Sequence, residues 1–318
     1  MPSRCSELSV ARSAVRGRRA RGAFPYCGAG MDALEMVADW PVERAAVGVM
    51  TIDRTAPNGG TWAVVGIIGP HSERFRWASV TKPATALAVL VASEEGTLSL
   101  DDPAGPPGST VRHLLAHASG LGLDPGPPVA PPGAGRIYSN AGYLVLADLL
   151  EERSGITFGD YLSLGVLEPL GMVGTTLEPD ALAGAAAAGL SGPLSDLLVL
   201  GRELAAPVLI SAETHRQATS VQFPGLGGVL PGFQQFDDDD WGLGVEIRGR
   251  KHPHWTGTTN SPETFGHFGR TGSFLWVDPV AGVLCGGLSD RPFGMWSARA
   301  WPRLADAVLA EVAQGASP

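Results

Sequence analysis

Lysine is almost absent from this chain of 318 residues, in which Lys82 and Lys251 are the two lysines. Arginine carries nearly all of the positive charge. Cysteine is also scarce, and Cys5, Cys27 and Cys285 have spacings that fit neither a disulfide framework nor a thiolate metal site. No stretch reaches the roughly 18 consecutive apolar residues that a membrane span needs. A Gly-x-Ser-x-Gly elbow and a Walker lysine are also missing, which disfavours an α/β-hydrolase and a nucleotide-binding site.

The charge balance is acidic, with a formal net charge of −9, and this argues against nucleic acid or an anionic membrane as a partner. Residues 1–30 are the exception, because they are rich in arginine and hold a single acidic residue. They contain no apolar run long enough for the core of a signal peptide, although a mitochondrial-type presequence has a similar composition. We expect a disordered basic extension here, a folded part that begins near Met31, and a cytoplasmic location.

The remaining residues, 31–318, are expected to form one ordered domain, since 44% of the chain is hydrophobic and 17% charged. Residues 46–68 are predicted to form two strands around a turn at 58–60, and further short strands are predicted after about residue 240. Helices are predicted at 79–95, 141–154, 159–169 and 195–205 and in the C-terminal tail. Because strands lie at both ends, the predicted fold is α+β, with one sheet built from both termini and a helical subdomain at roughly 97–200 inserted.

The motif Ser79-Val80-Thr81-Lys82 suggests why a lysine is kept in a chain that otherwise uses arginine. Residues three apart on a helix share a face, so the Ser79 hydroxyl and the Lys82 amine can approach each other. A serine is a poor nucleophile until a base takes its proton, and a desolvated lysine can serve as that base, whereas arginine cannot. The alternative is that Ser79 only caps the helix and Lys82 lies in solvent, an arrangement that the helix dipole disfavours.

Two further motifs follow along the chain, YSN at 138–140 and HFG at 267–269. A chain with four tyrosines rarely contains Tyr-x-Asn by chance, whereas His-x-Gly is expected about once by accident. The alternatives are a core position for Tyr138, a helix cap for Asn140 and a structural role for His267.

The motifs and their order, together with the segments EEGTLSLDDP, RHLLAHASGL and YLSLGVLEPLGM, resemble the serine β-lactamase and penicillin-recognising family. The similarity is greatest to its class C branch, which includes D-Ala-D-Ala peptidases and serine esterases, and it runs from about residue 47 to residue 290. The resemblance implies an antiparallel sheet flanked by helices, a helical subdomain packed against it, and a site between the two.

Carried over to this chain, the resemblance assigns a role to each motif residue. Ser79 would be the acylated nucleophile, and Lys82 would accept or relay its proton. Tyr138 would act as general base and then protonate the leaving group. Asn140 would orient the substrate and Lys82, and His267 would stand on a strand that lines the site, where the family usually has a lysine or histidine.

The resemblance also implies an oxyanion hole formed by the backbone N–H groups of Ser79 and Arg270, with Gly269 among the residues that position the substrate. The chain departs from the family at Phe268, because a hydroxyl residue that helps to grip a substrate carboxylate is usual there. Phenylalanine has no hydrogen-bonding capacity, so the departure favours an ester or small amide over penicillins and D-Ala-D-Ala peptides.

The sequence therefore predicts a serine hydrolase that works through an acyl-enzyme on small carboxylic esters or amides, without a cofactor or metal. A β-lactamase or D-Ala-D-Ala carboxypeptidase is the alternative within the same fold, and a catalytically silent binding or scaffold protein is the alternative from another class. The expected partner is a small ester, amide or β-lactam-like molecule, and the oligomeric state is left open.

Other conspicuous residues are given structural interpretations. His113 and His117 are expected to be hydrogen-bonded helix and loop residues. The acidic segment 236–242, FDDDDWG, is expected to be a solvated turn before a strand, because it lacks the ligand pattern of a calcium loop. His252 and His254 have no acidic or cysteine partner at ligand spacing, so no zinc site is expected.

Overall fold

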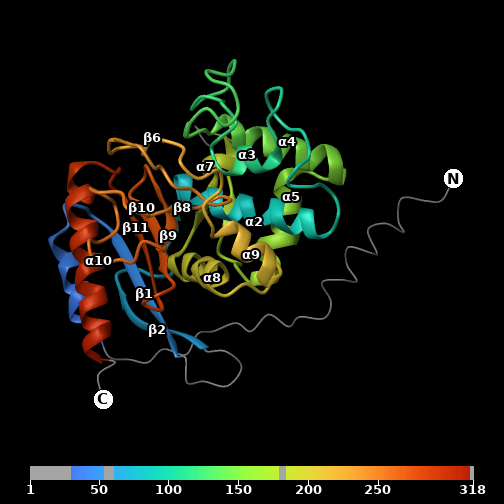
Figure 1. Ribbon diagram of the computed structural model, residues 1–318. Coiled ribbons are helices and arrows are strands. Elements are labelled where there is room, and N and C mark those ends of the chain that lie inside the picture. Colours follow the sequence, from blue (N-terminus) through green and yellow to red (C-terminus); the bar gives the residue numbers. More distant parts are fainter. Residues whose placement is uncertain (1–29, 54–60, 179–183, 316–318) are drawn as a thin grey trace.

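The computed structural model describes residues 30–53, 61–178 and 184–315, and its main element is a six-stranded antiparallel sheet in the order β2-β1-β11-β10-β9-β8 (Figure 1). Its strands are β1 (Ala45–Asp53), β2 (Thr61–Ile68), β8 (Glu246–Ile247), β9 (Phe265–Gly269), β10 (Ser273–Asp278) and β11 (Val283–Ser289). The prediction of one sheet built from both termini is confirmed. The turn predicted at 58–60 and the basic extension lie outside the described residues.

Strand β1 is an interior strand of the sheet, next to the edge strand β2, because it pairs on both sides. It pairs with β11 from Ala45 opposite Ser289 to Thr51 opposite Val283, and with β2 along its other edge. All residues of β10 and β11 are buried, as are residues 46–50 of β1. A strand buried on both faces is continuously apolar, so these segments do not show the alternation of a half-exposed strand.

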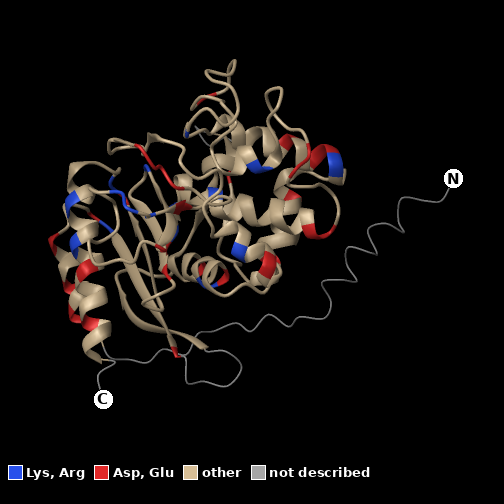
Figure 2. Cartoon of the chain, viewed as in Figure 1, with Lys and Arg blue, Asp and Glu red and all other residues tan. Residues whose placement is uncertain are grey.

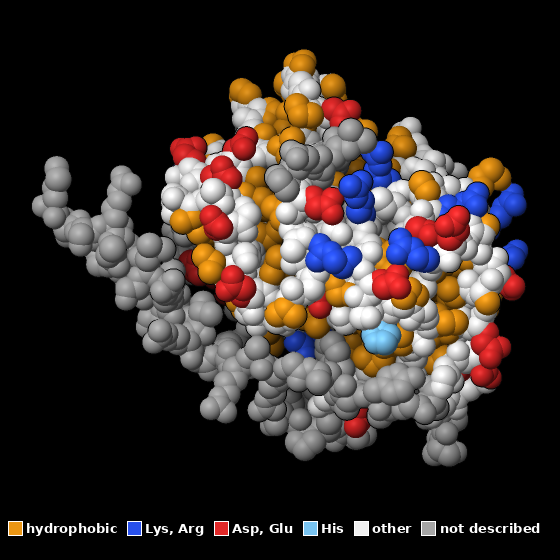
Figure 3. All heavy atoms as spheres, turned by 180° about the vertical axis from the view of Figure 1, so that it is seen from behind, with side chains coloured by type: hydrophobic (Ala, Val, Ile, Leu, Met, Phe, Trp, Pro, Cys, Tyr) orange, Lys and Arg blue, Asp and Glu red, His pale blue; other side chains and the backbone are white. Residues whose placement is uncertain are grey.

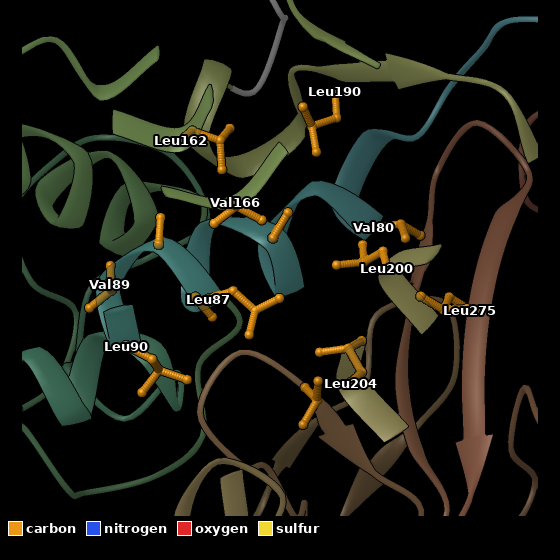
Figure 4. Packing of buried hydrophobic residues seen from close by; sticks show 14 of the residues in the cluster. Val80, Leu87, Val89, Leu90, Leu162, Val166, Leu190, Leu200, Leu204 and Leu275 are labelled. Atoms are coloured by element: carbon orange, nitrogen blue, oxygen red, sulfur yellow. The ribbon is translucent and has the colours of Figure 1, made fainter. Parts of the chain in front are cut away.

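Helices cover both faces of this sheet (Figure 1). On one face, η1 (Asp32–Asp39) and α10 (Met295–Gly315) pack over a core that includes Phe274 and Trp301. On the other face, α8 (Leu194–Ala205) packs against β1, β10 and β11. Figure 4 shows Val80, Leu200 of α8 and Leu275 of β10 close together, so that a single apolar core joins the sheet to the helical region.

The remaining elements are short and lie mostly in the helical region. The helices are η2 (Ala78–Val80), α2 (Thr81–Glu94), α3 (Val111–Leu115), α4 (Ala141–Ser154), α5 (Phe158–Leu162), the π-helical η3 (Ser163–Leu167), α6 (Glu168–Leu170), α7 (Ala185–Ala188) and α9 (Ala212–Ala218). The short strands are β3 (Phe75–Arg76), β4 (Thr176–Leu177), β5 (Leu190–Gly192), β6 (Gly228–Val229) and β7 (Gln235–Phe236). The helices predicted at 79–95, 141–154 and 195–205 are thus confirmed.

Helix α2 lies at the centre of the helical region, and residues 81–92 are all buried. A helix that is apolar all round is typical of a position inside a core rather than on a surface. The helix ends at Gly96, which has a φ of 77° that glycine adopts without steric cost. At its other end η2 packs against β9 and β10, so the beginning of α2 is fixed at the junction between the helical region and the sheet.

Charged side chains lie mainly on the outer helices and on loops, while the strands of the sheet carry few (Figure 2). The opposite side of the molecule mixes acidic, basic and apolar side chains, and Figure 3 shows no single-sign patch across that face. None of the described helices is long and apolar enough to cross a bilayer.

Candidate active site

Ser79 lies in the single turn η2, between β3 and α2, and its side chain is partly exposed. Neither η2 nor α2 has a side-chain hydrogen bond at its N-cap, so Ser79 does not cap a helix. The preceding residue, Ala78, has a φ of 45° in the left-handed region, which is unfavourable for a residue with a Cβ. Backbone strain of this kind is found most often at functional sites, where it holds one side chain in a fixed direction.

Lys82 reaches this hydroxyl from one turn further along, and its Nζ lies 3.4 Å from Ser79 Oγ. The side chain is fully buried, so the alternative in which Lys82 points into solvent is wrong. Nζ also donates to Asn140 Oδ1 at 2.7 Å and to the Ala187 carbonyl oxygen at 3.0 Å. Burial lowers the pKa of Lys82 well below its ordinary value, because no carboxylate of the described residues is paired with the amine to offset its desolvation.

Two of the contacts made by Lys82 assign its hydrogens. A neutral amine has two N–H bonds. Here both N–H bonds donate, one to the Asn140 side-chain oxygen and one to the Ala187 carbonyl oxygen, and these oxygens can only accept. The lone pair of the neutral amine is then left for the third neighbour, the hydroxyl of Ser79. This arrangement would allow the amine to act as a general base towards the hydroxyl.

Tyr138 and Asn140 close the site from the helical side. Burial raises the pKa of Tyr138 above its ordinary value, so at rest the phenol keeps its proton. The side chain of Ser79 is near enough to the Tyr138 hydroxyl to lower its pKa slightly, and Lys82 Nζ lies 4.8 Å from the centre of the Tyr138 ring. Asn140 occupies the N-cap position of α4 but makes no side-chain cap, because its side chain turns to Lys82 instead.

The turn between β9 and β10 lies against the other side of Ser79. Thr271 Oγ1 donates to the Arg76 carbonyl oxygen at 2.8 Å, and Ser273 Oγ donates to the Trp77 carbonyl oxygen at 2.6 Å. A Cβ at Gly269 would overlap this carbonyl oxygen of Trp77, so only glycine allows the strand to come so close. These contacts bring the turn that contains Arg270 to the segment directly before Ser79, as an oxyanion hole would require.

His267 of β9 lies beside Tyr138, with 5.9 Å between the ring centres. Its Nδ1 donates to the carbonyl oxygen of Phe268 at 2.8 Å, which leaves an unprotonated Nε2. Burial, together with nearby Lys82, lowers the pKa of His267 to about 3. The residue is therefore neutral at physiological pH and offers the site an acceptor rather than the positive charge of a lysine.

We expect kcat/KM for p-nitrophenyl acetate to rise with pH through a single limb with its midpoint well below the ordinary pKa of lysine. In the scheme in which Lys82 activates Ser79, acylation requires the neutral amine of Lys82, whose pKa is lowered by burial. His267 stays neutral because its pKa is about 3, so no limb is expected near the ordinary histidine pKa of about 6.5. Initial rates between about pH 5 and about pH 9 test this, and a limb near pH 6.5 would contradict the neutral state of His267.

His117 is a residue whose surroundings were not anticipated from the sequence. It is fully buried, its Nδ1 accepts from the Ser139 backbone N–H at 3.2 Å, and its Nε2 has no hydrogen-bond partner among the described residues. The expectation of a hydrogen-bonded loop histidine is therefore met at Nδ1 but not at Nε2, whereas His113 hydrogen-bonds with Thr110 as expected. The His117 ring lies 4.6 Å from that of Tyr138, so His117 packs directly behind a site residue.

The second lysine, Lys251, is also buried, but its surroundings are the reverse of those of Lys82. Its Nζ lies 2.8 Å from Glu246 Oε1 and 3.5 Å from Asp239 Oδ1. Glu246 accepts two more hydrogen bonds, from His254 and from Trp255, each at 3.0 Å. These opposite charges and donors outweigh desolvation and lower the pKa of Glu246 to about 2, so the pair is an internal ion pair.

This ion pair corrects the interpretation of the acidic segment. Asp239 is 2% exposed, so the segment is not a fully solvated turn. Because it is buried, the pKa of Asp239 is raised to about 6. His254 is hydrogen-bonded to Glu246 and Thr256, and the described part of the chain contains no group of three or more His, Cys, Asp or Glu side chains arranged for a metal ion.

A separate pocket of about 620 Å³ lies where the ends of α8 and α9 meet the sheet, and it is lined among others by Trp62, Val221, Ile247 and Phe265. None of the residues predicted to act on substrate lines it. Proximity to Ser79, rather than pocket size, therefore identifies the candidate site.

Comparisons with known proteins bear on the family and the fold of this chain. The family model described as Beta-lactamase matches residues 30–310. Penicillin-binding protein 4* of Bacillus subtilis (strain 168) is 32% identical over 134 residues, which is 31% of this chain and 29% of that protein, so the chain matches less than a third of its length. A crystal structure of a beta-lactamase from Mycobacterium bovis superposes with a TM-score of 0.82 at 50% identity, covering 88% of this chain and 99% of that one.

A more distant structure shares the fold alone. EstCE1, a hydrolase with promiscuous acyltransferase activity, superposes with a TM-score of 0.69 at 18% identity, covering 96% of this chain and 99% of that one.

Proposed function

The chain belongs to the beta-lactamase family of serine hydrolases, and we propose that it hydrolyses neutral carboxylic esters through an acyl-enzyme on Ser79. One observation carries the proposal: a fully buried lysine, with both hydrogens of its neutral form engaged, lies 3.4 Å from a partly exposed serine hydroxyl. A structural lysine would be paired with a carboxylate, as Lys251 is, and Lys82 has none among its hydrogen-bonding neighbours.

In the first step Lys82 Nζ takes the proton of Ser79 as Oγ attacks the ester carbonyl carbon. A carbon–oxygen bond forms, and the carbonyl oxygen becomes an oxyanion that the backbone N–H groups of Ser79 and Arg270 would hold. Asn140 Oδ1 keeps Lys82 Nζ in place and accepts from it in both the neutral and the protonated state. Lys82 rather than Tyr138 is the first acceptor, because the raised pKa of Tyr138 disfavours a phenolate in the resting enzyme.

In the second step the ester bond to the leaving alcohol breaks, and Tyr138 gives its proton to the departing oxygen. The ammonium of Lys82 then gives a proton to Tyr138. The phenolate of Tyr138 is therefore short-lived beside this positive charge. Water then attacks the acyl carbon, the same residues take its proton, and Ser79 Oγ recovers its hydrogen as the acid leaves. Each proton returns to its starting position, so no cofactor is needed.

Phe268 and His267 make a neutral substrate the best match to the site. The third motif presents no hydroxyl at residue 268 and no cation at residue 267, since His267 is neutral. An anionic substrate group placed against these two residues would lose its hydration without gaining an ionic partner from either of them. An ester without a carboxylate has no such cost.

The test is turnover of p-nitrophenyl acetate, with intact-protein mass spectrometry to detect the acyl group on Ser79. We expect turnover and an adduct that Ser79→Ala abolishes, while hydrolysis of the β-lactam nitrocefin is slower by at least about 100-fold in kcat/KM. No turnover of the ester and no adduct on Ser79 would contradict the proposal.

β-Lactamase or D-Ala-D-Ala carboxypeptidase activity is the second candidate, and the names of the relatives favour it. The structure from Mycobacterium bovis is called a beta-lactamase, and the relative from Bacillus subtilis a penicillin-binding protein. Preferred turnover of nitrocefin, or release of D-alanine from a D-Ala-D-Ala peptide, would select this candidate over the esterase.

A further inference from the structure

Three phenylalanine side chains meet next to the candidate site and form what we call the aromatic wall: Phe233, Phe268 and Phe293. The ring centres of Phe268 and Phe293 are 4.7 Å apart, and Phe233 lies 6.1 Å from the first and 6.0 Å from the second. The three residues come from different segments: the turn between β6 and β7, strand β9, and the turn before α10. Tertiary packing alone brings them together.

The wall is fixed from behind by two buried tryptophans. Trp255 lies 5.6 Å from Phe268, and Trp301 lies 5.4 Å from Phe293. Both tryptophans are at most 2% exposed, whereas the three phenylalanines are each only partly buried. The rear of the cluster is closely packed, but the three phenylalanines stay partly exposed. Their apolar surface is therefore available for contact with another molecule.

The wall adjoins the reacting groups through β9. Phe268 stands between His267, whose ring faces Tyr138, and Gly269, which lies against the backbone of Trp77. His267 and Gly269, its two neighbours in the strand, thus both contact residues of the candidate site. Phe268 lies between them, so the wall begins at the strand that lines the site.

We propose that the aromatic wall binds a flat apolar group of the substrate, so that the preferred substrates are neutral esters that carry an aryl group. This inference rests on the proposed function and names its substrate class. Aromatic rings at centre-to-centre distances of about 4.5–7 Å attract each other in offset or edge-to-face geometry, and the triangle of rings already has these spacings. A carboxylate in this place would be desolvated against three side chains that cannot hydrogen-bond.

The experiment compares esters that differ by one ring. The first pair is p-nitrophenyl phenylacetate and p-nitrophenyl acetate, which differ by a ring on the acyl side. The second pair is phenyl acetate and methyl acetate, which differ by a ring on the alcohol side. We expect Phe233→Ala and Phe293→Ala to lower the ratio of kcat/KM values by about 10-fold in one of these pairs, because the intrinsic reactivity cancels between variant and native enzyme. The pair that responds identifies the side of the ester that contacts the wall.

The matched control is Val173→Ala, which truncates an apolar side chain that is 93% exposed in the turn after α6. It should leave both ratios within about 2-fold of the native values. Thermal unfolding followed by circular dichroism checks that each variant is folded, and Phe293→Leu replaces Phe293→Ala if that variant unfolds. Unchanged ratios in all folded wall variants would overturn the inference.

The competing occupant is an anionic substrate that pairs with Arg270, an exposed residue directly after β9. Mono-p-nitrophenyl succinate tests it, and a native kcat/KM for this ester above that for p-nitrophenyl phenylacetate would also overturn the inference. The aromatic-wall proposal and the proposed function can be rejected independently of each other. Acetate turnover with unchanged ratios rejects only the wall, whereas the absence of an acyl adduct on Ser79 rejects the proposed function itself.

Discussion

Lys82→Met is expected to lower kcat/KM for p-nitrophenyl acetate by about 10³-fold, within the range observed when a general base is removed. Methionine has a similar length and is apolar, so it fills the buried space without a charge. The nucleophile remains, but no group next to Ser79 can take its proton, since burial keeps Tyr138 in its neutral form. Stopped-flow acylation and the mass of the acyl-enzyme measure the loss directly.

Folding is expected to survive this change. Methionine leaves the acceptors on Asn140 and Ala187 without a donor, but it also removes an amine whose burial is unfavourable, so the melting temperature should shift by only a few degrees. Methionine is a better probe than arginine, which is too large for a fully buried side chain and would retain its charge. A folded Lys82→Met enzyme that kept more than a tenth of the native activity would show that the base is another residue.

Lys251→Met is the matched substitution, and we expect it to lower the free energy of unfolding by about 3–5 kcal/mol. It leaves the carboxylate of Glu246 buried with two neutral hydrogen-bond donors, on His254 and Trp255, but without its cation. The acyl-enzyme should still form at a near-native rate per folded molecule, because Lys251 makes no contact with Ser79. Urea unfolding at pH 7 and active-site titration separate the two effects.

A double substitution and the pH dependence sharpen this prediction. Lys251→Met combined with Glu246→Gln removes both charges and should regain part of the lost stability. The folded pKa of Glu246 is about 2, below its ordinary value of 4.5, so the stability it contributes is present above about pH 4.5 and is lost as the pH falls towards 2. The difference between native and Lys251→Met protein should therefore shrink below pH 4.5. Equal stability of the two proteins at pH 7 would contradict the ion-pair assignment.

The parts of the fold that depend on local sequence were predicted successfully. The helix beginning near Ser79, the helix ending at Gly155 and the terminal strands follow from apolar spacing and from glycine positions, and the structure confirms them. Local rules were insufficient for the acidic segment, where Asp239 is buried because a lysine twelve residues later pairs with it. They also gave no indication that the ring of His117 packs against Tyr138 and Trp241, which come from other segments.

The sequence by itself determined that a serine and an amine share one face of a helix, because a spacing of three residues has the same consequence in any helix. It also determined the family, through three short motifs in a fixed order. Only the tertiary structure decided which of the two lysines is buried without a charged partner and which is buried in an ion pair. Desolvation and ion pairing depend on neighbours brought from far along the chain: Asn140 and Ala187 surround Lys82 with neutral acceptors, whereas Glu246 keeps Lys251 paired.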